Sequence, residues 1–223
     1  MNVPNIIEQL VKGNSLFTQE HSPEYFDSFR QHQTPYITLV TCSDSRVPLQ
    51  ALMPDTSNRI FTIKNIGNQI FSTEGSVDYG IYHLKTSVLL ILGHSDCGAI
   101  RAYLKGFYEE TFNIKHELDF LRPLIKDNAT ESEFGKMHTQ AIENNLDYQV
   151  NIACKKYKQL IADGKLTVIG AYYDFADAFG KGQGRIVIVN VNKHKTEGEL
   201  RDLPLFDRLS DDEKEKYIGR LHP

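Results

Sequence analysis

The chain has 223 residues, of which 40% are hydrophobic and 24% are charged, and its formal net charge at pH 7 is −4. This composition is ordinary for a globular protein, and the length suits one large domain better than two small ones. The negative charge argues against nucleic acid or an anionic membrane as a partner. The longest strongly apolar run, Val88 to Leu92, is far shorter than the roughly 20 residues that a membrane helix needs.

The N-terminal stretch MNVPNIIEQL has no basic start, no sustained apolar core and no small-residue cleavage site. We therefore expect a cytoplasmic protein. The chain contains three cysteines, Cys42, Cys97 and Cys154. An odd number of cysteines without an export signal argues against a disulfide framework and leaves metal binding or catalysis as their role.

The first half of the chain predicts two helices and then strands that alternate with helices. Ser22 as N-cap and Pro23 at the first helical position begin one helix, and an earlier one is expected near Ile6 to Leu16. Strands are predicted at Tyr36 to Val40, Arg59 to Ile63 and Ser87 to Gly93. The last of these is continuously aliphatic, as parallel strands covered on both faces tend to be. The spacing of Val77, Ile81 and Leu84 predicts a crossover helix before it.

The second half continues this alternation. A helix is expected after Cys97 through AIRAYLKG, and residues 133 to 162 are expected to be largely helical. Two strands, LTVIGAYYDF and RIVIVNV, follow, and the glycine-rich stretch between them is interpreted as a hairpin loop rather than a phosphate site. Ser210 and Glu213 fit a capping box at the start of one last helix.

Strands that alternate with helices predict an α/β fold with a mainly parallel central sheet flanked by helices. We expect a single domain over residues 1–223. It comprises an N-terminal helical arm (1–33), an α/β core (34–192) and a C-terminal tail with one helix (193–223).

Two polar motifs follow predicted strands. In TCSDSRVP, the side chains of Cys42, Asp44 and Arg46 would point to one face if the strand continued through them. In GHSDCGAI, His94 and Cys97 stand where a strand gives way to a helix. Since ligand crevices of open α/β sheets lie at the carboxyl ends of the strands, two thiolates and one imidazole are expected to converge if the strands are neighbours.

Two sulfurs and one nitrogen suit Zn²⁺, and three protein ligands leave its fourth position open, as in a catalytic site. The alternative is that these are buried cysteines packed as small hydrophobic side chains. Asp44 would either bind the metal or accept a hydrogen bond from its water, and Arg46 would hold Asp44 ionised and oriented. A structural ion pair at a strand end is the simpler alternative for these two residues.

The motifs CSDSR and HSDC resemble those of the β-class carbonic anhydrases. The segments HQTPYITLVTCSDSRVP, IFTIKNIGN, EGSVDYGIYHLKTSVLLILGHSDCGAI and VIGAYYDF resemble family segments in the same order, from about Gln33 to Phe175. This resemblance implies one Zn²⁺ per chain, bound by Cys42, His94 and Cys97, with Asp44 and Arg46 as a catalytic dyad. It further implies a substrate pocket formed by Gln33, Phe61, Ile66, Tyr79 and Gly98, and a homodimer or tetramer in which the partner completes the pocket.

The implied activity is the reversible hydration of CO₂ to bicarbonate and a proton by a zinc-bound hydroxide that Asp44 and Arg46 steer. One alternative is hydrolysis of carbon disulfide or carbonyl sulfide on the same scaffold, and another is a non-catalytic zinc or thiol-redox protein. His83, His116 and His138 are proton-shuttle candidates by residue type alone. Lys64 stands where the family often has arginine, which argues against a second, inhibitory bicarbonate site and weakly favours a metal site that Asp44 does not close.

Overall fold

The computed structural model of the chain describes residues 2–121 and 133–221. It divides into two compact units, residues 1–34 and 35–223. The smaller unit contains α1 (Val3–Glu20) and α2 (Pro23–Asp27). Asn2 caps α1 by accepting a hydrogen bond from the backbone N–H of Asn5, and Ser22 is the N-cap of α2, as its sequence predicts.

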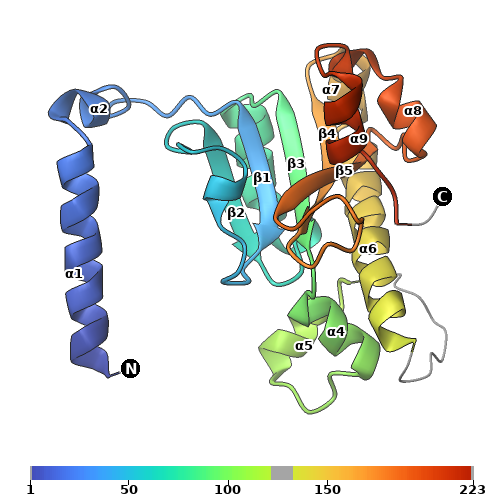
Figure 1. Cartoon of the computed structure of the whole chain (residues 1–223), viewed down its shortest axis with the longest axis horizontal. Coiled ribbons are helices and arrows are strands. Elements are labelled where there is room, and N and C mark those ends of the chain that lie inside the picture. The colour runs from blue at the N-terminus through green and yellow to red at the C-terminus, as the bar shows by residue number, and fades with distance from the viewer. Residues whose placement is uncertain (1, 122–132, 222–223) are drawn as a thin grey trace. The chain divides into compact units, whose positions relative to one another are not determined.

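The larger unit is built on one five-stranded sheet (Figure 1). Its strands lie in the order β2-β1-β3-β4-β5. The first four are parallel, and β5 runs antiparallel to β4, which confirms the predicted hairpin. Their bounds are β1 (Ile37–Cys42), β2 (Ile60–Asn65), β3 (Val88–His94), β4 (Thr167–Asp174) and β5 (Arg185–Val191).

Helices connect and cover these strands. The crossover before β3 is a short helix that continues as a π-helical segment, and α6 packs along β3, β4 and β5 (Figure 1). One short helix in the middle of the chain, α5, was not predicted. The helices are α3 (Glu74–Asp78), the π-helical η3 (Tyr79–His83), α4 (Gly98–Lys105), α5 (Phe112–Leu118), α6 (Phe134–Lys156) and α7 (Lys158–Ala162).

The central strand β3 is a continuous aliphatic run because apolar clusters cover both faces of the sheet. Val40 and Ile91 point into the larger cluster with Leu146 and Val150 of α6. Their strand neighbours, such as Leu39, belong to a smaller cluster on the opposite face. Successive side chains of a strand alternate between faces, so a continuous aliphatic run is what this arrangement requires.

The C-terminal tail differs from the expectation of one helix. It contains two α-helices, α8 (Glu197–Arg201) and α9 (Asp211–Tyr217). Thr196 and Glu199 form a capping box at α8 of the same kind that Ser210 and Glu213 form at α9. The helix that the prediction missed is held by Leu200, which is fully buried in an apolar cluster formed by the tail together with Val191 of β5.

The order of the strands positions a crevice. β1 lies between β2 and β3 in the sheet. The chain passes from β1 to β2 on one side and then returns past β1 to β3 on the other side, so the order of the strands reverses at β1. In open α/β sheets the ligand crevice lies at such a switch point, outside the carboxyl ends of the strands. Those ends are Cys42 of β1 and His94 of β3.

Candidate metal centre and active site

The first motif lies where β1 ends. Cys42 is the last residue of the strand and is buried. The chain then turns: the backbone N–H of Arg46 donates to Asp44 Oδ1 at 2.9 Å, and that of Val47 donates to the Asp44 carbonyl. The expectation that Cys42, Asp44 and Arg46 share one face of a strand is therefore wrong, because an aspartate-stabilised turn replaces the strand after Cys42.

The second motif lies where β3 ends and α4 begins. His94 is the last residue of β3 and is completely buried, and Cys97 is the N-cap residue of α4. Between them Asp96 has a φ of 54°, the left-handed conformation that lets the chain turn sharply from strand to helix. The expected switch from strand to helix at this motif is confirmed.

The side chains of Cys42, His94 and Cys97 converge, with their ligand atoms all within 4.8 Å of one another. Nδ1 of His94 lies 2.9 Å from the carbonyl oxygen of Ser95, so Nδ1–H is the donor and Nε2 keeps its lone pair. Nε2 is buried and has no hydrogen-bond partner among the described residues. A buried acceptor without a partner, next to two sulfurs, fits Zn²⁺, whose coordination would satisfy it.

The sulfurs of Cys42 and Cys97 shift each other's pKa in opposite directions. A hydrogen bond from Cys97 lowers the pKa of Cys42 to about 4, and the same contact, together with burial, raises the pKa of Cys97 well above its usual value. Backbone amides of Ala99 and Ile100, in the first turn of α4, face the Cys97 sulfur and act in the opposite direction. A dication bound between the two sulfurs would favour the thiolate of Cys97 and so oppose this rise in its pKa.

Asp44 and Arg46 form a bidentate ion pair beside this group. Arg46 Nε donates to Asp44 Oδ1 at 2.9 Å and Nη2 donates to Oδ2 at 2.7 Å. This hydrogen bonding holds the pKa of Asp44 far below its usual range and raises that of Arg46. Asp44 Oδ2 lies 3.9 Å from His94 Nε2, so an ionised carboxylate, which can only accept hydrogen bonds, faces the metal-ligand group.

Sequence reasoning missed two residues that contact Arg46. Asp96 accepts hydrogen bonds from its guanidinium, and the Phe175 ring lies 5.0 Å from the guanidinium carbon. Phe175 is also stacked on His94, with ring centroids 6.2 Å apart. Both residues lay within quoted motifs, HSDC and VIGAYYDF, but nothing in the spacing of either motif indicates a contact with Arg46.

The predicted pocket residues are partly brought together. The rings of Phe61 and Tyr79 are 5.7 Å apart, and the side chain of Ile66 is exposed one residue beyond Asn65, the partner of Cys42 in the sheet. A Cβ at Gly98 would meet no other atom within 4 Å, so open space lies beside this first residue of α4. Gln33 belongs to the separate N-terminal unit, and its role stays a prediction.

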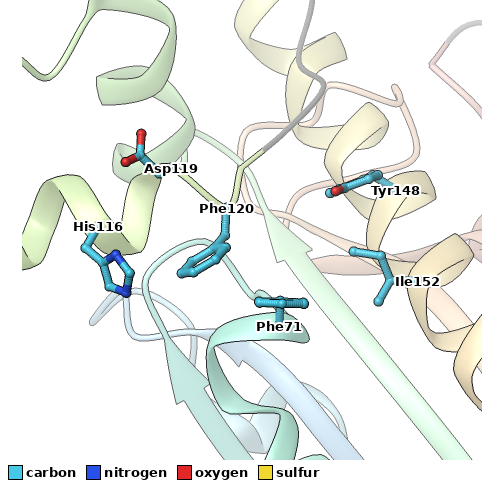
Figure 2. Close-up of a pocket in the computed structure, with 6 residues that line it drawn as sticks. All are labelled: Phe71, His116, Asp119, Phe120, Tyr148 and Ile152. Carbon is cyan, nitrogen blue, oxygen red and sulfur yellow. The ribbon is translucent and has the colours of Figure 1, made fainter.

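The three histidines proposed as shuttles lie in different surroundings. His138 is buried, with Nε2 2.9 Å from the Cys97 carbonyl, and burial lowers its pKa. His83 is stacked on Tyr79. His116 lines a cavity of about 440 Å³ between α5 and α6, together with Phe71, Asp119, Phe120, Tyr148 and Ile152 (Figure 2). None of these six lining residues belongs to the metal-ligand group or the predicted pocket.

Two further observations bear on the expectations from the sequence. Lys64 Nζ donates to the carbonyl of Val47 at 3.2 Å, so its ammonium is tied to the turn after β1. Among residues 2–121 and 133–221, no helix is both long and apolar enough to cross a bilayer.

The fold and the site together define an α/β protein with a buried Cys₂His ligand set at a topological switch point, the type of site that binds catalytic zinc. The carbonic anhydrase family model matches residues 37–181. The chain therefore belongs to the carbonic anhydrase family, and its fold is similar to that of solved β-carbonic anhydrases. The predicted family and enzyme class are confirmed.

Individual relatives agree with this assignment. A carbonic anhydrase of Helicobacter pylori is 25% identical over 195 residues, covering 78% of this chain and 85% of the relative. One from Synechococcus elongatus is 27% identical over 186 residues, covering 75% and 68%. A tetrameric β-carbonic anhydrase of Sordaria macrospora superposes with a TM-score of 0.69 at 21% identity, covering 83% of this chain and 97% of that one. This last likeness concerns the fold.

Proposed function

We propose that this chain hydrates CO₂ reversibly to bicarbonate and a proton, using one zinc ion bound by Cys42, His94 and Cys97. CO₂ hydration is the general reaction of the family to which the chain belongs. The observation that carries the proposal is the convergence of two sulfurs and a partnerless imidazole nitrogen next to an ionised aspartate. Thiol-redox exchange or metal storage would not require that aspartate.

Zinc, when bound, supplies a Lewis acid that lowers the pKa of water from 15.7 to about 7, so that hydroxide is available near neutral pH. The role that we assign to Asp44 is to orient the oxygen that attacks CO₂. Because Arg46 keeps its carboxylate ionised, Asp44 can accept a hydrogen bond from the attacking oxygen and cannot donate one. Because the hydrogen of the attacking oxygen then points to Asp44, a lone pair of that oxygen is left facing the substrate. The role of Arg46 is to fix Asp44 through its two parallel hydrogen bonds.

The substrate would lie against an apolar wall. The paired rings of Phe61 and Tyr79, with the exposed Ile66, are suited to CO₂, which has no hydrogen to donate. The open space at Gly98 leaves room next to the Cys97 ligand. Gln33 is proposed to donate a hydrogen bond to a substrate oxygen.

We also propose that the enzyme is a homodimer or a tetramer in the cytoplasm. One similar structure is described as tetrameric, which supports an oligomer without fixing its size. Several large apolar side chains of the larger unit, such as Phe71 and Tyr82, are exposed in the single chain. An interface between copies would cover them.

The test is stopped-flow CO₂ hydration at pH 7 and pH 8.5, with zinc determined by mass spectrometry on the same sample. Cys154→Ala is the matched control, because this buried thiol lies on α6 outside the ligand group. We expect about one zinc per chain and fast hydration in both proteins. One zinc per chain without hydration at either pH would contradict the proposal, and carbon disulfide and carbonyl sulfide would then be tested as substrates.

A further inference from the structure

The guanidinium of Arg46 is shared between two acidic residues. On one edge it makes the bidentate pair with Asp44. On the other, Nη1 donates to Asp96 Oδ2 at 3.1 Å and Nη2 donates to the backbone carbonyl of Asp96 at 2.9 Å. Four of the five guanidinium N–H groups thus have a defined acceptor, and two of those four acceptors belong to Asp96.

This second set of bonds matters because Arg46 is not enclosed. Its side chain is 45% exposed, whereas that of Asp44 is 16% exposed. A half-exposed ion pair is weakened by competing water and by the freedom of the long side chain. The contacts that restrict Arg46, apart from Asp44 itself, are Asp96 and the ring of Phe175.

Asp96 is itself held in place. Its other carboxylate oxygen, Oδ1, accepts a hydrogen bond from Arg101 on α4. Its backbone lies between two metal ligands, His94 and Cys97, in the turn that its φ of 54° creates. The position of Asp96 is therefore fixed by the same turn that delivers the ligands, and it transmits that position to Arg46.

We propose that Asp96 is a positioning residue of this active site, which anchors the Arg46 guanidinium so that its Nε–Nη2 edge stays on Asp44. The residues form a chain of alternating charge, Asp44, Arg46, Asp96 and Arg101, which connects the turn after β1 to the first helix after β3. Asp96 acts through Arg46 and touches no substrate. The inference rests on the proposed function only where it predicts a change in the rate of CO₂ hydration.

A purely structural role makes a different prediction. If Asp96 served only to form the turn, glycine would replace it fully, because glycine adopts a positive φ without strain. Asparagine also tolerates this conformation and keeps one side-chain oxygen that can accept from Arg46. The two substitutions therefore separate the backbone role from the anchoring role.

The experiment compares Asp96→Gly and Asp96→Asn in the full-length zinc enzyme. The direct readout is hydrogen exchange of the Arg46 Nε–H, followed by NMR of ¹⁵N-labelled protein and assigned by its loss in Arg46→Lys. The second readout is kcat/KM for CO₂ hydration. Asp177→Gly is the matched control, because Asp177 is an exposed aspartate with a φ of 60° that binds only its own loop, at the N–H of Gly182.

We expect D96G to accelerate exchange of the Arg46 Nε–H and to lower kcat/KM, each by about fivefold, the scale of one half-exposed charge pair. D96N should show about a twofold effect, and D177G none. Unchanged exchange in folded D96G would overturn the proposal; if D96G does not fold, unchanged exchange in D96N would do so. Should the wild type not hydrate CO₂ at all, the exchange measurement still tests the anchoring of Arg46 independently.

Discussion

Two networks of partly exposed charged side chains in the larger unit are similar in chemistry and different in surroundings. The first runs through Asp44, Arg46, Asp96 and Arg101 beside the metal-ligand group. In the second, Lys156 Nζ binds Glu74 at 2.6 Å and Asp78 at 2.9 Å, while the hydroxyl of the neighbouring Tyr157 donates to the other oxygen of Asp78 at 2.7 Å. Both connect segments that are distant in the sequence.

What differs is the group that each network faces. Asp44 Oδ2 lies 3.9 Å from Nε2 of His94, so the first network faces the group that we propose to bind zinc. The second ties α3 to the end of α6 through the buried Tyr157, and none of its members is a predicted site residue. Similar ion pairs should therefore affect different quantities, the first the rate of catalysis and the second the free energy of unfolding.

The largest effect should come from breaking the centre that the first network serves. Cys97→Ser replaces a fully buried sulfur ligand, so we expect loss of zinc and hydration no faster than the uncatalysed reaction. Zinc content and stopped-flow hydration measure both quantities. If C97S keeps a full equivalent of zinc and its activity, the ligand assignment is wrong.

A smaller but still large effect is expected when only the dyad is broken. Asp44→Asn keeps the shape of the side chain and removes the charge that Arg46 stabilises, so hydration should fall about 100-fold while zinc is retained. The control is Asp212→Asn, which removes an exposed i,i+4 pair with Lys216 and should leave the rate unchanged. Wild-type rates in D44N would argue that Asp44 has no part in the reaction.

The second network should respond in stability instead. Tyr157→Phe removes one hydrogen bond to Asp78, which should lower the free energy of unfolding at pH 7 by about 1 kcal/mol, with hydration per zinc unchanged. Burial, and then Asp78, raise the pKa of Tyr157 in the folded state. A raised folded-state pKa contributes stability that is present below the unfolded value of about 10 and is lost as the pH rises above it.

The expected signature of Y157F is therefore a shallower loss of stability above pH 10 than in the wild type. Urea unfolding at pH 7, 10 and 11 measures it, with Tyr108→Phe as the control because Tyr108 is fully exposed. Parallel pH curves for wild type and Y157F would contradict the assigned role of this buried hydroxyl.

Much of the fold could be predicted from the sequence because its signals are local. The aliphatic run before GHSDC gave β3, and Ser210 with Glu213 gave α9, each to within a few residues. Thr196 and Glu199 show the same capping-box pattern at the start of α8, but that helix was not predicted. α5 was missed because its seven residues, FNIKHEL, mix apolar and charged side chains without a clear period and are held by tertiary contacts of Leu118.

For the candidate site, the convergence of the ligands could be predicted from the sequence, but the contacts around Arg46 could not. The convergence of the three candidate metal ligands could be predicted because Cys42 and His94 each end a strand, Cys97 follows His94 by three residues, and the ends of parallel strands meet. Asp44 and Arg46 do form the expected ion pair, but in a turn after Cys42 and not in the strand geometry that the spacing suggested, and their catalytic role stays a prediction. Asp96 and Phe175 could not be assigned to Arg46, since their contacts depend on how two loops from different strands pack together.

The candidate ligands come from different strands, so zinc binding would report whether those strands have paired. Cys42 and His94 lie on strands that are separated in the chain by all of β2 and its following helix, and they meet only when β1 has paired with β3. A chain in which this pairing has not formed offers the ion no more than the neighbouring His94 and Cys97. If zinc binds here as proposed, the amount of tightly held zinc would measure the fraction of molecules in which β1 has paired with β3, whether or not they turn over substrate.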